Sequence, residues 1–264
     1  ILALNQKLLG MNHCIKPYNG IKNFLTAEER HMNPLLKNPM YKLSKRLLDI
    51  LVSFTGLLIL LPIFIPIAIA LKLSGEGEIF YFQERVGINN KTFKIFKFAT
   101  MLKNSEKMGS GIYTAKDDPR ILPLGSFLRK SKINELPQII NILIGHISLV
   151  GPRPLIKRTF ELYSDEDQKL ISSIKPGLTG IGSIIFRNEE ELLLNADRDN
   201  MEEFYEKNIT PYKAELEKWY VSKSSFMNDM LLIILTAWVI IFKKSNLVWL
   251  IFKDLPKNIT VNSQ

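Results

Sequence analysis

The chain has 264 residues, of which 46% are hydrophobic, and its net charge is +9. This length allows one sizeable domain plus membrane elements, and the basic excess suits an anionic bilayer surface or a phosphorylated substrate. A single cysteine, Cys14, excludes an internal disulfide, and three scattered histidines argue against a zinc site. Nucleic-acid binding is the rival interpretation of a basic protein. We expect no nucleic-acid partner, because the sequence has no aromatic-basic repeat and no zinc pattern.

Residues 1–40 are weakly periodic, and we interpret them as an N-terminal extension without chemistry. Residues 41–74 contain the most apolar run, Ile50 to Leu71, which holds no charged side chain. As a straight helix this run would extend about 33 Å, enough to cross a hydrocarbon core. Pro62 and Pro66 predict a kink near its middle, because each proline removes a backbone donor.

Basic residues flank the apolar run on both sides. A spanning helix usually carries its positive charge on the cytoplasmic side only. We therefore expect a re-entrant helix hairpin that leaves the membrane by the face it entered, with all polar parts on the cytoplasmic side. One tilted spanning helix remains the alternative. A core helix of a soluble protein is less favoured, because no comparably apolar segment is present to bury it.

Residues 75–225 are predicted to form a small, mostly helical α+β domain. Alternating apolar residues in 79–86 and 92–98 predict a β-hairpin. Residues 101–111 suggest a helix. In 133–144 the apolar residues recur at helical spacing, which predicts a helix with one buried face.

Further elements of this domain are less regular. We expect Ser131 to cap the helix at 133–144 and Gly145 to end it. A polar helix is predicted over 161–174, a short strand over 184–186, and a charged helix from Glu189 to Tyr220, broken at Pro211.

Residues 226–264 form the C-terminal part. The apolar run Met230 to Phe242 is short for a membrane span, which needs about twenty residues. Trp238, Trp249 and the adjacent lysines are typical of a helix that lies in the interface at headgroup depth. We therefore predict an interfacial helix followed by a tail.

Three charged or glycine-rich stretches could carry chemistry. Asp117-Asp118-Pro119-Arg120 is a rigid charged elbow, although alone it is typical of an ordinary solvated turn. Pro152 and Pro154 fix the backbone of Arg153, whose planar fork suits phosphate recognition or pairing with one of those carboxylates. The loop 175–183 is rich in glycine, so its N–H groups could approach phosphate oxygens; this signal is weak.

Several long motifs follow one another in a recognisable order. They are the kinked apolar segment LLPIFIPIAIALKL, FQERVG (82–87), FKIFKFATM (93–101), DDPR (117–120), GSFLRKSKINELPQIINIL (125–143), ISLVGPRPL (147–155) and KPGLTGIGS (175–183). In these motifs the chain, from about Tyr41 to about Phe242, resembles the bacterial sugar transferases that act as monotopic polyprenyl-phosphate phosphoglycosyl transferases.

This resemblance implies a re-entrant membrane helix and a catalytic domain on the cytoplasmic face of the bacterial inner membrane. It implies transfer of a sugar phosphate from a UDP-sugar to undecaprenyl (polyprenyl) phosphate, with release of UMP and with Mg2+ as cofactor. Such a step initiates assembly of a cell-surface glycan: O-antigen, capsule, exopolysaccharide or a glycoprotein glycan. The expected partners are these two substrates and inner-membrane lipid; a homo-oligomer is left open.

The resemblance also assigns residues. Asp117 matches the nucleophile that forms a covalent aspartyl-phosphosugar intermediate, Asp118 is its acidic neighbour, and both are the expected metal ligands. The polar positions expected to bind substrate are Lys97, Arg120, Glu135, Arg153 and Arg187.

Departures from the family pattern leave a second interpretation open. Ala99 stands where the family usually has Arg, Asn134 where it usually has Asp, and His146 where an acidic residue is common. Leu61-Pro62 replaces the usual Ser-Pro, and an Asp before the Trp-Tyr pair appears as Glu217 or is displaced. The alternative is a catalytically weakened member that acts as a membrane-surface scaffold in a glycan assembly complex. The sequence does not identify the sugar.

Overall fold

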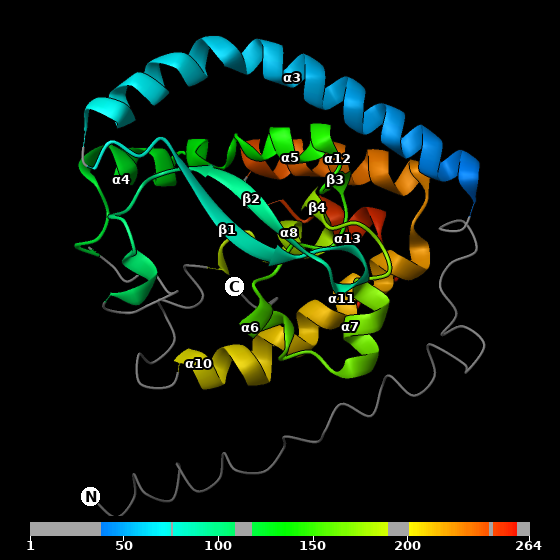
Figure 1. The fold of residues 1–264 in the computed structure, drawn as a ribbon. Helices are drawn as coiled ribbons and strands as arrows, with labels where there is room; N and C mark the ends of the chain where they lie inside the picture. Colours follow the sequence, from blue (N-terminus) through cyan, green and yellow to red (C-terminus); the bar gives the residue numbers. More distant parts are fainter. Residues whose placement is uncertain (1–37, 75, 109–117, 190–200, 243–244, 258–264) are drawn as a thin grey trace, which may run out of the picture.

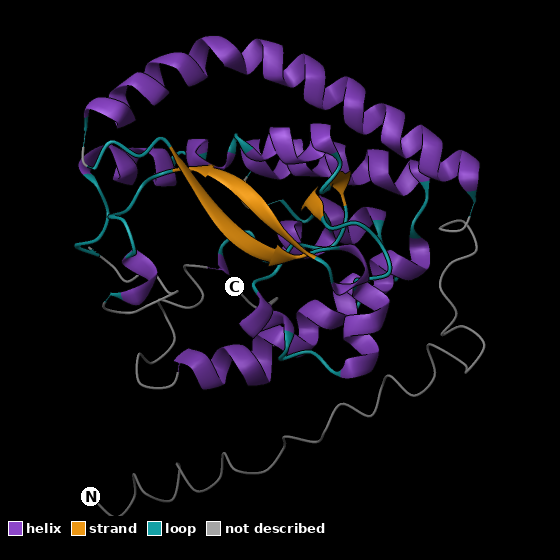
Figure 2. Cartoon of the chain, viewed as in Figure 1, coloured by secondary structure: helices purple, strands orange, loops and turns teal. Residues whose placement is uncertain are grey.

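The computed structural model describes residues 38–74, 76–108, 118–189, 201–242 and 245–257. The described part combines many helices with two small sheets of two strands each (Figures 1 and 2). This mixture agrees with the α+β class predicted from the sequence.

Helix α3, Pro39–Leu73, arches over the rest of the protein (Figure 1). The side chain of Asn38 caps its start by accepting a hydrogen bond from the Met40 N–H. Pro62 and Pro66 both lie inside the helix, which stays continuous through them. The helix bows where a helix hairpin was expected (Figure 1). Whether α3 dips into a membrane and returns stays a prediction.

Helix α3 is the one helix in the described residues that is long and apolar enough to cross a membrane, judged by length and composition. Only 11% of its most apolar window is buried inside the protein. Its inner side contacts α5 along much of its length, and Phe64 and Leu71 are buried against the domain. The apolar outer side is left exposed.

The predicted hairpin is confirmed. Strands β1 (Phe80–Val86) and β2 (Thr92–Phe98) pair antiparallel, with Phe80 opposite Phe98 and Val86 opposite Thr92. The connecting turn Ile88–Asn90 places Asn89 and Asn90 at φ 53° and 59°. Asparagine tolerates this left-handed region better than most residues, which explains why the turn forms here.

Helix α4 (Pro123–Lys130), the 3-10 turn Ile133–Glu135 and helix α5 (Gln138–Ile144) follow. The predicted helix is thus present, with its first turn in 3-10 form. Gly145 ends it at φ 88°, as expected. Ser131 does not cap it: Ser131 follows the C-terminal end of α4, and Lys132 at φ 59° separates the two elements.

Two predicted elements are wrong. In the described part of 101–111 only Ser105–Lys107 forms a 3-10 turn. The backbone near residues 100–102 pairs instead with the segment 120–122: the Leu102 N–H donates to the Arg120 carbonyl, and the Leu122 N–H donates to the Thr100 carbonyl. Residues 184–186, expected as a strand, fall mostly in helix α8 (Ile181–Ile185), because Ile181 and Ile184 at helical spacing both enter the core.

A second, parallel sheet joins β3 (Ser148–Val150) to β4 (Gly177–Thr179). Between them lie α6 (Lys157–Phe160) and α7 (Asp165–Ile171), which replace the single helix predicted over 161–174. Ser164 caps α7 by accepting a hydrogen bond from the Asp167 N–H at 3.2 Å.

The C-terminal helices complete the core. They are α10 (Met201–Phe204), a wide π turn at Tyr205–Ile209, α11 (Thr210–Lys223), α12 (Phe226–Ile241) and α13 (Leu247–Ile251). The main hydrophobic cluster unites residues of α8, α11, α12 and α13. Helix α12 buries Leu232 and Leu235 in this cluster, while its apolar Ile240 and Ile241 stay exposed. It is therefore part of the core and also presents an apolar outer face.

Candidate functional site

Strand β2 and the turn before α5 bring two of the predicted substrate-binding residues together. Lys97 Nζ lies 3.1 Å from Glu135 Oε1. Burial alone would raise the pKa of Glu135, but the charges of Lys97 and Arg153 outweigh it and lower the pKa to about 2. Burial lowers the pKa of Lys97, and Glu135 opposes that shift. Glu135 is therefore ionised at neutral pH and lies within ion-pair distance of Lys97.

Arg153 contributes to the same electrostatic group from the turn after β3. Its charge acts on both Lys97 and Glu135, as does that of Arg85 on Lys97. Arg85 on β1 is fixed by a 3.1 Å hydrogen bond to the Pro154 carbonyl. Lys97, Arg153 and Lys132 thus all lower the pKa of Glu135, and the Arg153 side chain is exposed. This leaves a positive potential suited to a phosphorylated ligand.

Asp118 and Arg120 form a separate, buried pair. One Asp118 oxygen accepts from the Arg120 N–H and Nε, and the other accepts from a terminal nitrogen at 2.6 Å. Arg120 also donates to the carbonyls of Ser105 and Met108, 2.7 Å each. The predicted substrate ligand Arg120 therefore fixes the loop at 105–108. No described contact joins Arg153 to Asp118, and Asp117 lies outside the described residues, so pairing of Arg153 with one of these carboxylates stays a prediction.

Asp117, the expected nucleophile, lies outside the described residues. The described residues contain no group of three or more His, Cys, Asp or Glu side chains arranged to hold a metal. Magnesium commonly takes one or two carboxylates and completes its shell with substrate phosphates and water. Both Asp118 oxygens accept hydrogen bonds from Arg120, and Asp117 lies outside the described residues, so a magnesium site at these two carboxylates stays a prediction.

Arg187 follows α8 and is half-buried. One of its terminal nitrogens is buried without a hydrogen-bond partner among the described residues. No described contact joins Arg187 to the Lys97, Glu135 and Arg153 group. Of the five predicted substrate-binding residues, the structure therefore brings three together and places Arg120 and Arg187 apart from them.

A second charged group was missed by sequence reasoning. Lys213 on α11 is buried, donates to Glu189 and to the Tyr205 hydroxyl, and lies 5.1 Å over the Phe186 ring. The sequence gives only an indirect signal for it: a charged side chain at a helix position that faces the core.

Glu217, one turn further along α11, completes this group. It is buried, accepts a 3.4 Å hydrogen bond from the Arg153 N–H, and has one oxygen that finds no hydrogen-bond partner in the described part of the chain. Burial raises the pKa of Glu217 to about 7, against the opposing effects of that hydrogen bond and of Lys213. A carboxyl that titrates near neutral pH therefore contacts the backbone of the Arg153 turn.

The glycine-rich loop packs against that same turn. A Cβ on Gly177 would lie 2.1 Å from the Gly151 nitrogen, and one on Gly180 would lie 2.2 Å from the Gly151 oxygen. The Gly177 N–H donates to the Pro152 carbonyl at 2.8 Å, and the Gly151 N–H to the Thr179 carbonyl at 2.9 Å. These glycines are needed because two backbones approach closely, so phosphate binding by their N–H groups finds no support.

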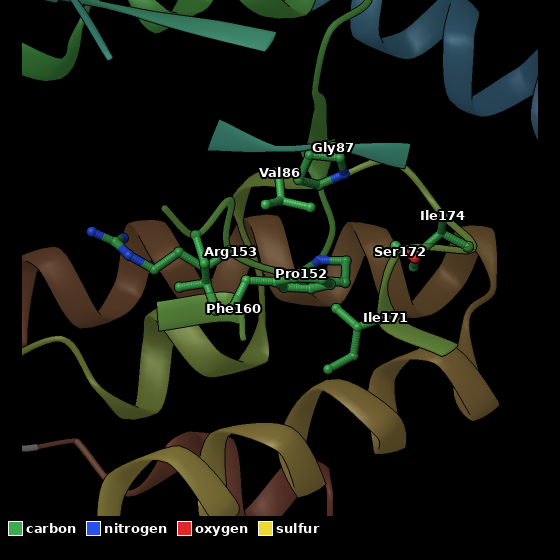
Figure 3. A pocket seen from close by; sticks show the side chains of 10 residues that line it. Val86, Gly87, Pro152, Arg153, Phe160, Ile171, Ser172 and Ile174 are labelled. Carbon is green, nitrogen blue, oxygen red and sulfur yellow. The ribbon is translucent and has the colours of Figure 1, made fainter. Parts of the chain in front are cut away.

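A small pocket opens beside the Arg153 turn (Figure 3). Its lining is largely apolar and includes Val86, Pro152, Phe160 and Ile171. The Arg153 guanidinium points away from these side chains in Figure 3. An apolar lining does not suit a diphosphate, so the charged group, and not this pocket, is the candidate for anion binding.

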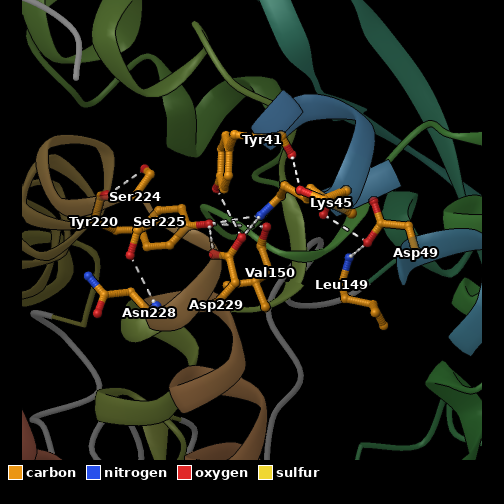
Figure 4. A network of polar contacts seen from close by, with 12 residues as sticks. Tyr41, Lys45, Asp49, Leu149, Val150, Tyr220, Ser224, Ser225, Asn228 and Asp229 are labelled. Atoms are coloured by element: carbon orange, nitrogen blue, oxygen red, sulfur yellow. Dashed lines mark hydrogen bonds and ion pairs between the residues drawn. The ribbon is translucent and has the colours of Figure 1, made fainter. Parts of the chain in front are cut away.

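A polar network fixes α3 to the domain (Figure 4). Asp229 at the start of α12 accepts hydrogen bonds from Tyr41 at 2.9 Å, Lys45 at 2.6 Å and Tyr220 at 2.7 Å. Asp49, further along α3, accepts from the Leu149 N–H at 2.8 Å. The first half of α3 is thus joined by buried polar bonds to the strand that leads to Arg153.

Arg46 adds a third attachment. It donates to the carbonyls of Ile142 and Leu143 at the end of α5, 2.7 Å each. A cation there also interacts favourably with the negative end of the helix dipole. Helix α3 and the domain therefore form one packed unit.

Comparison with known proteins gives a consistent result. The family model described as bacterial sugar transferase matches residues 40–243. The chain is 34% identical over 236 residues, 84% of its length, to the UDP-glucose:undecaprenyl-phosphate glucose-1-phosphate transferase of Klebsiella pneumoniae, of which it covers 47%. It is 31% identical over 242 residues, 85% of its length, to the undecaprenyl-phosphate galactose phosphotransferase of Salmonella typhimurium, of which it covers 46%.

A shorter relative is the exopolysaccharide production protein ExoY of Sinorhizobium fredii. It is 37% identical over 165 residues, which are 57% of this chain and 73% of that protein. The chain thus spans about half the length of the two longer relatives and about three quarters of the shorter one.

Proposed function

Because the chain belongs to the bacterial sugar transferase family, we propose that it transfers a sugar phosphate from a UDP-sugar to undecaprenyl (polyprenyl) phosphate and releases UMP. The names of its relatives support the acceptor and the class of reaction. The structural observation that carries the proposal is the Lys97, Glu135 and Arg153 group. This group places positive charge at one end of strand β2, and β2 packs against the apolar helix α3.

Both substrates are anionic, so the site must neutralise charge before they meet. Arg153 and Lys97 do this in a partly buried environment, where each charge acts more strongly than in water. Glu135 keeps Lys97 charged and oriented. Glu217 contacts the backbone N–H of Arg153 and so helps to fix the turn that presents the guanidinium.

The proposed chemistry has two displacements. The Asp117 carboxylate forms a bond to the sugar-bearing phosphorus of the donor, and the bond to the UMP oxygen breaks. The phosphate oxygen of the lipid then attacks the same phosphorus and releases the Asp117 carboxylate. Magnesium, held by Asp118 and Asp117, would neutralise charge on the transferred phosphate when bound.

We further propose that the protein sits at the cytoplasmic face of the inner membrane, with α3 half inserted. Contacts from Tyr41 to Leu71 join both halves of α3 to one domain. A straight spanning helix would carry one end about 30 Å away from the domain. Tags placed at residue 35 and at residue 76 should both be protected from externally added reagents in intact spheroplasts; opposite accessibility would refute the re-entrant placement.

A panel of UDP-sugars with polyprenyl phosphate tests the activity. We expect UMP release with at least one donor and none with Asp117→Asn, while Asp117→Asn remains membrane-bound. Release of UMP by Asp117→Asn at the wild-type rate would refute the assignment of the nucleophile. No release with any donor would favour the non-catalytic scaffold.

A further inference from the structure

Five phenylalanine rings form a continuous series from the middle of α3 along one face of the hairpin. We call this series the aromatic stripe; it consists of Phe64, Phe98, Phe80, Phe82 and Phe96. The ring centroids of neighbours lie 5.2 Å (Phe64 and Phe98), 5.7 Å (Phe98 and Phe80), 6.4 Å (Phe80 and Phe82) and 5.1 Å (Phe82 and Phe96) apart. Such spacings are those of rings in direct contact.

The aromatic stripe is buried at one end and open at the other. Phe64 and Phe98 are 8% and 1% exposed, whereas Phe80 and Phe82 are 37% and 50% exposed. Phe64 lies between the two prolines of α3, in the most apolar part of the chain. The open part is therefore joined through two buried rings to the helix expected to meet the bilayer, and exposed apolar surface of this kind can mark a binding site.

The opposite face of the same hairpin is charged. Residues directly across an antiparallel pair share a face, so Tyr81 and Lys97 lie on the face away from the aromatic stripe. Arg85 lies on that face too. On the stripe face, Lys94 follows Phe96 in the alternation and lies opposite Glu84. Two short strands thus carry an apolar surface on one face and Lys97 of the candidate site on the other.

We propose that the open half of the aromatic stripe binds the isoprenoid chain of the polyprenyl phosphate acceptor. This inference rests on the proposed function. A polyprenyl phosphate is a branched hydrocarbon with an anionic end. The exposed rings offer the hydrocarbon an apolar surface near α3, and Lys97, which lies between Phe96 and Phe98 on the same strand, offers the phosphate a cation on the other face of the sheet. Contact between the aromatic stripe and α3 favours a lipid as the ligand, because a soluble peptide or a second copy of the chain would not require that contact.

Acceptor chain length provides the test. The full chain in detergent micelles is assayed with undecaprenyl phosphate and with geranyl phosphate, at saturating donor. Phe82→Ser should raise KM for the long acceptor about tenfold, because the apolar contact between the Phe82 ring and the bound hydrocarbon is lost. It should change KM for the short acceptor and for the donor less than twofold. Phe82→Leu keeps an apolar side chain and should give an intermediate value.

Phe127→Ser is the matched control, since Phe127 on α4 is 60% exposed and makes no ring contact with the stripe. Its KM for the long acceptor should match the wild type. Equal changes for long and short acceptors in Phe82→Ser, or no change for either, would overturn the proposal. Loss of vesicle binding with unchanged KM in micelles would also overturn it, and would make the aromatic stripe a contact with bulk lipid.

A second measurement does not require turnover. A photoreactive polyprenyl phosphate should label the peptide that contains residues 80–86 in the wild type, and unlabelled undecaprenyl phosphate should compete. Labelling confined to other peptides would refute the inference. If the wild type binds this probe there but transfers no sugar phosphate, the proposed function fails while the acceptor subsite stands.

Discussion

Replacing Asp229 by Asn should loosen the attachment of α3 to the domain. Asp229 is 2% exposed and its carboxylate accepts from Tyr41, Lys45 and Tyr220. The Asn amide keeps the shape but removes the charge that pairs with Lys45 and leaves at least one buried hydroxyl without an acceptor. Breaking a buried pair from one side costs about 3–5 kcal/mol. The Lys45 side chain is 19% exposed and can reach water, so we expect about 3 kcal/mol.

For a chain of this size that loss corresponds to a Tm lower by about 6–12 °C, measured by thermal unfolding in detergent. Trypsin should also cleave faster after Lys42, Lys45 and Arg46, because the first half of α3 separates from the domain. Lys103→Gln is the control, since it breaks a pair with Glu78 in which both side chains are largely exposed; its Tm should not change. If Asp229→Asn and Lys103→Gln unfold at the same temperature, the network does not hold α3.

Three further predictions concern single residues. The folded-state pKa of Glu217 is raised to about 7, so the contribution of this carboxyl to stability is present at acid pH and is lost as pH rises through 7. Glu217→Gln should therefore have a higher Tm than the wild type at pH 8 and a similar Tm at pH 4.5. The pKa of Glu135 is lowered to about 2, so the contribution of this carboxylate to stability is present above about pH 4.5 and is lost as pH falls toward 2. Glu135→Gln should therefore lower the Tm at pH 7, and its Tm should equal that of the wild type below pH 2. Gly177→Ala, whose Cβ would lie 2.1 Å from the Gly151 nitrogen, should destabilise the protein by about 1–3 kcal/mol in denaturant titration, whereas Ser126→Ala on α4 should not.

The local elements with clear periodicity were predictable. The hairpin followed from alternation and its Asn-Asn turn, and the end of α5 followed from Gly145, because these signals act within a few residues. The predicted strand at 184–186 failed because burial of Ile181 and Ile184 at helical spacing outweighed the β propensity of an isoleucine pair. The 101–111 helix failed because its backbone pairs with residues near Arg120.

The site was predictable in composition but not in arrangement. Motif order identified Lys97, Glu135 and Arg153, and the structure joins them. Pairing between Lys97 and Glu135 depends on packing between β2 and the turn before α5, which the sequence does not encode locally. The commitment of both Asp118 oxygens to Arg120 was also missed, because Asp118 was assigned to a metal and Arg120 to the substrate. Buried Glu217 and Lys213 contradict the usual exposure of charged residues, so no pattern indicated them.

The π turn at Tyr205–Ile209 accommodates one residue more than a regular helical turn would hold. Each residue of an α-helix rotates the direction of the following side chain by about 100°. The turn therefore sets the angular phase between α10 and α11, and it is this phase that points Tyr205 at Lys213. Deleting one residue there would convert the π turn to a regular α-helical turn and rotate Tyr205 away from Lys213. A relative with one residue fewer at this point would therefore need another side chain to contact the buried lysine.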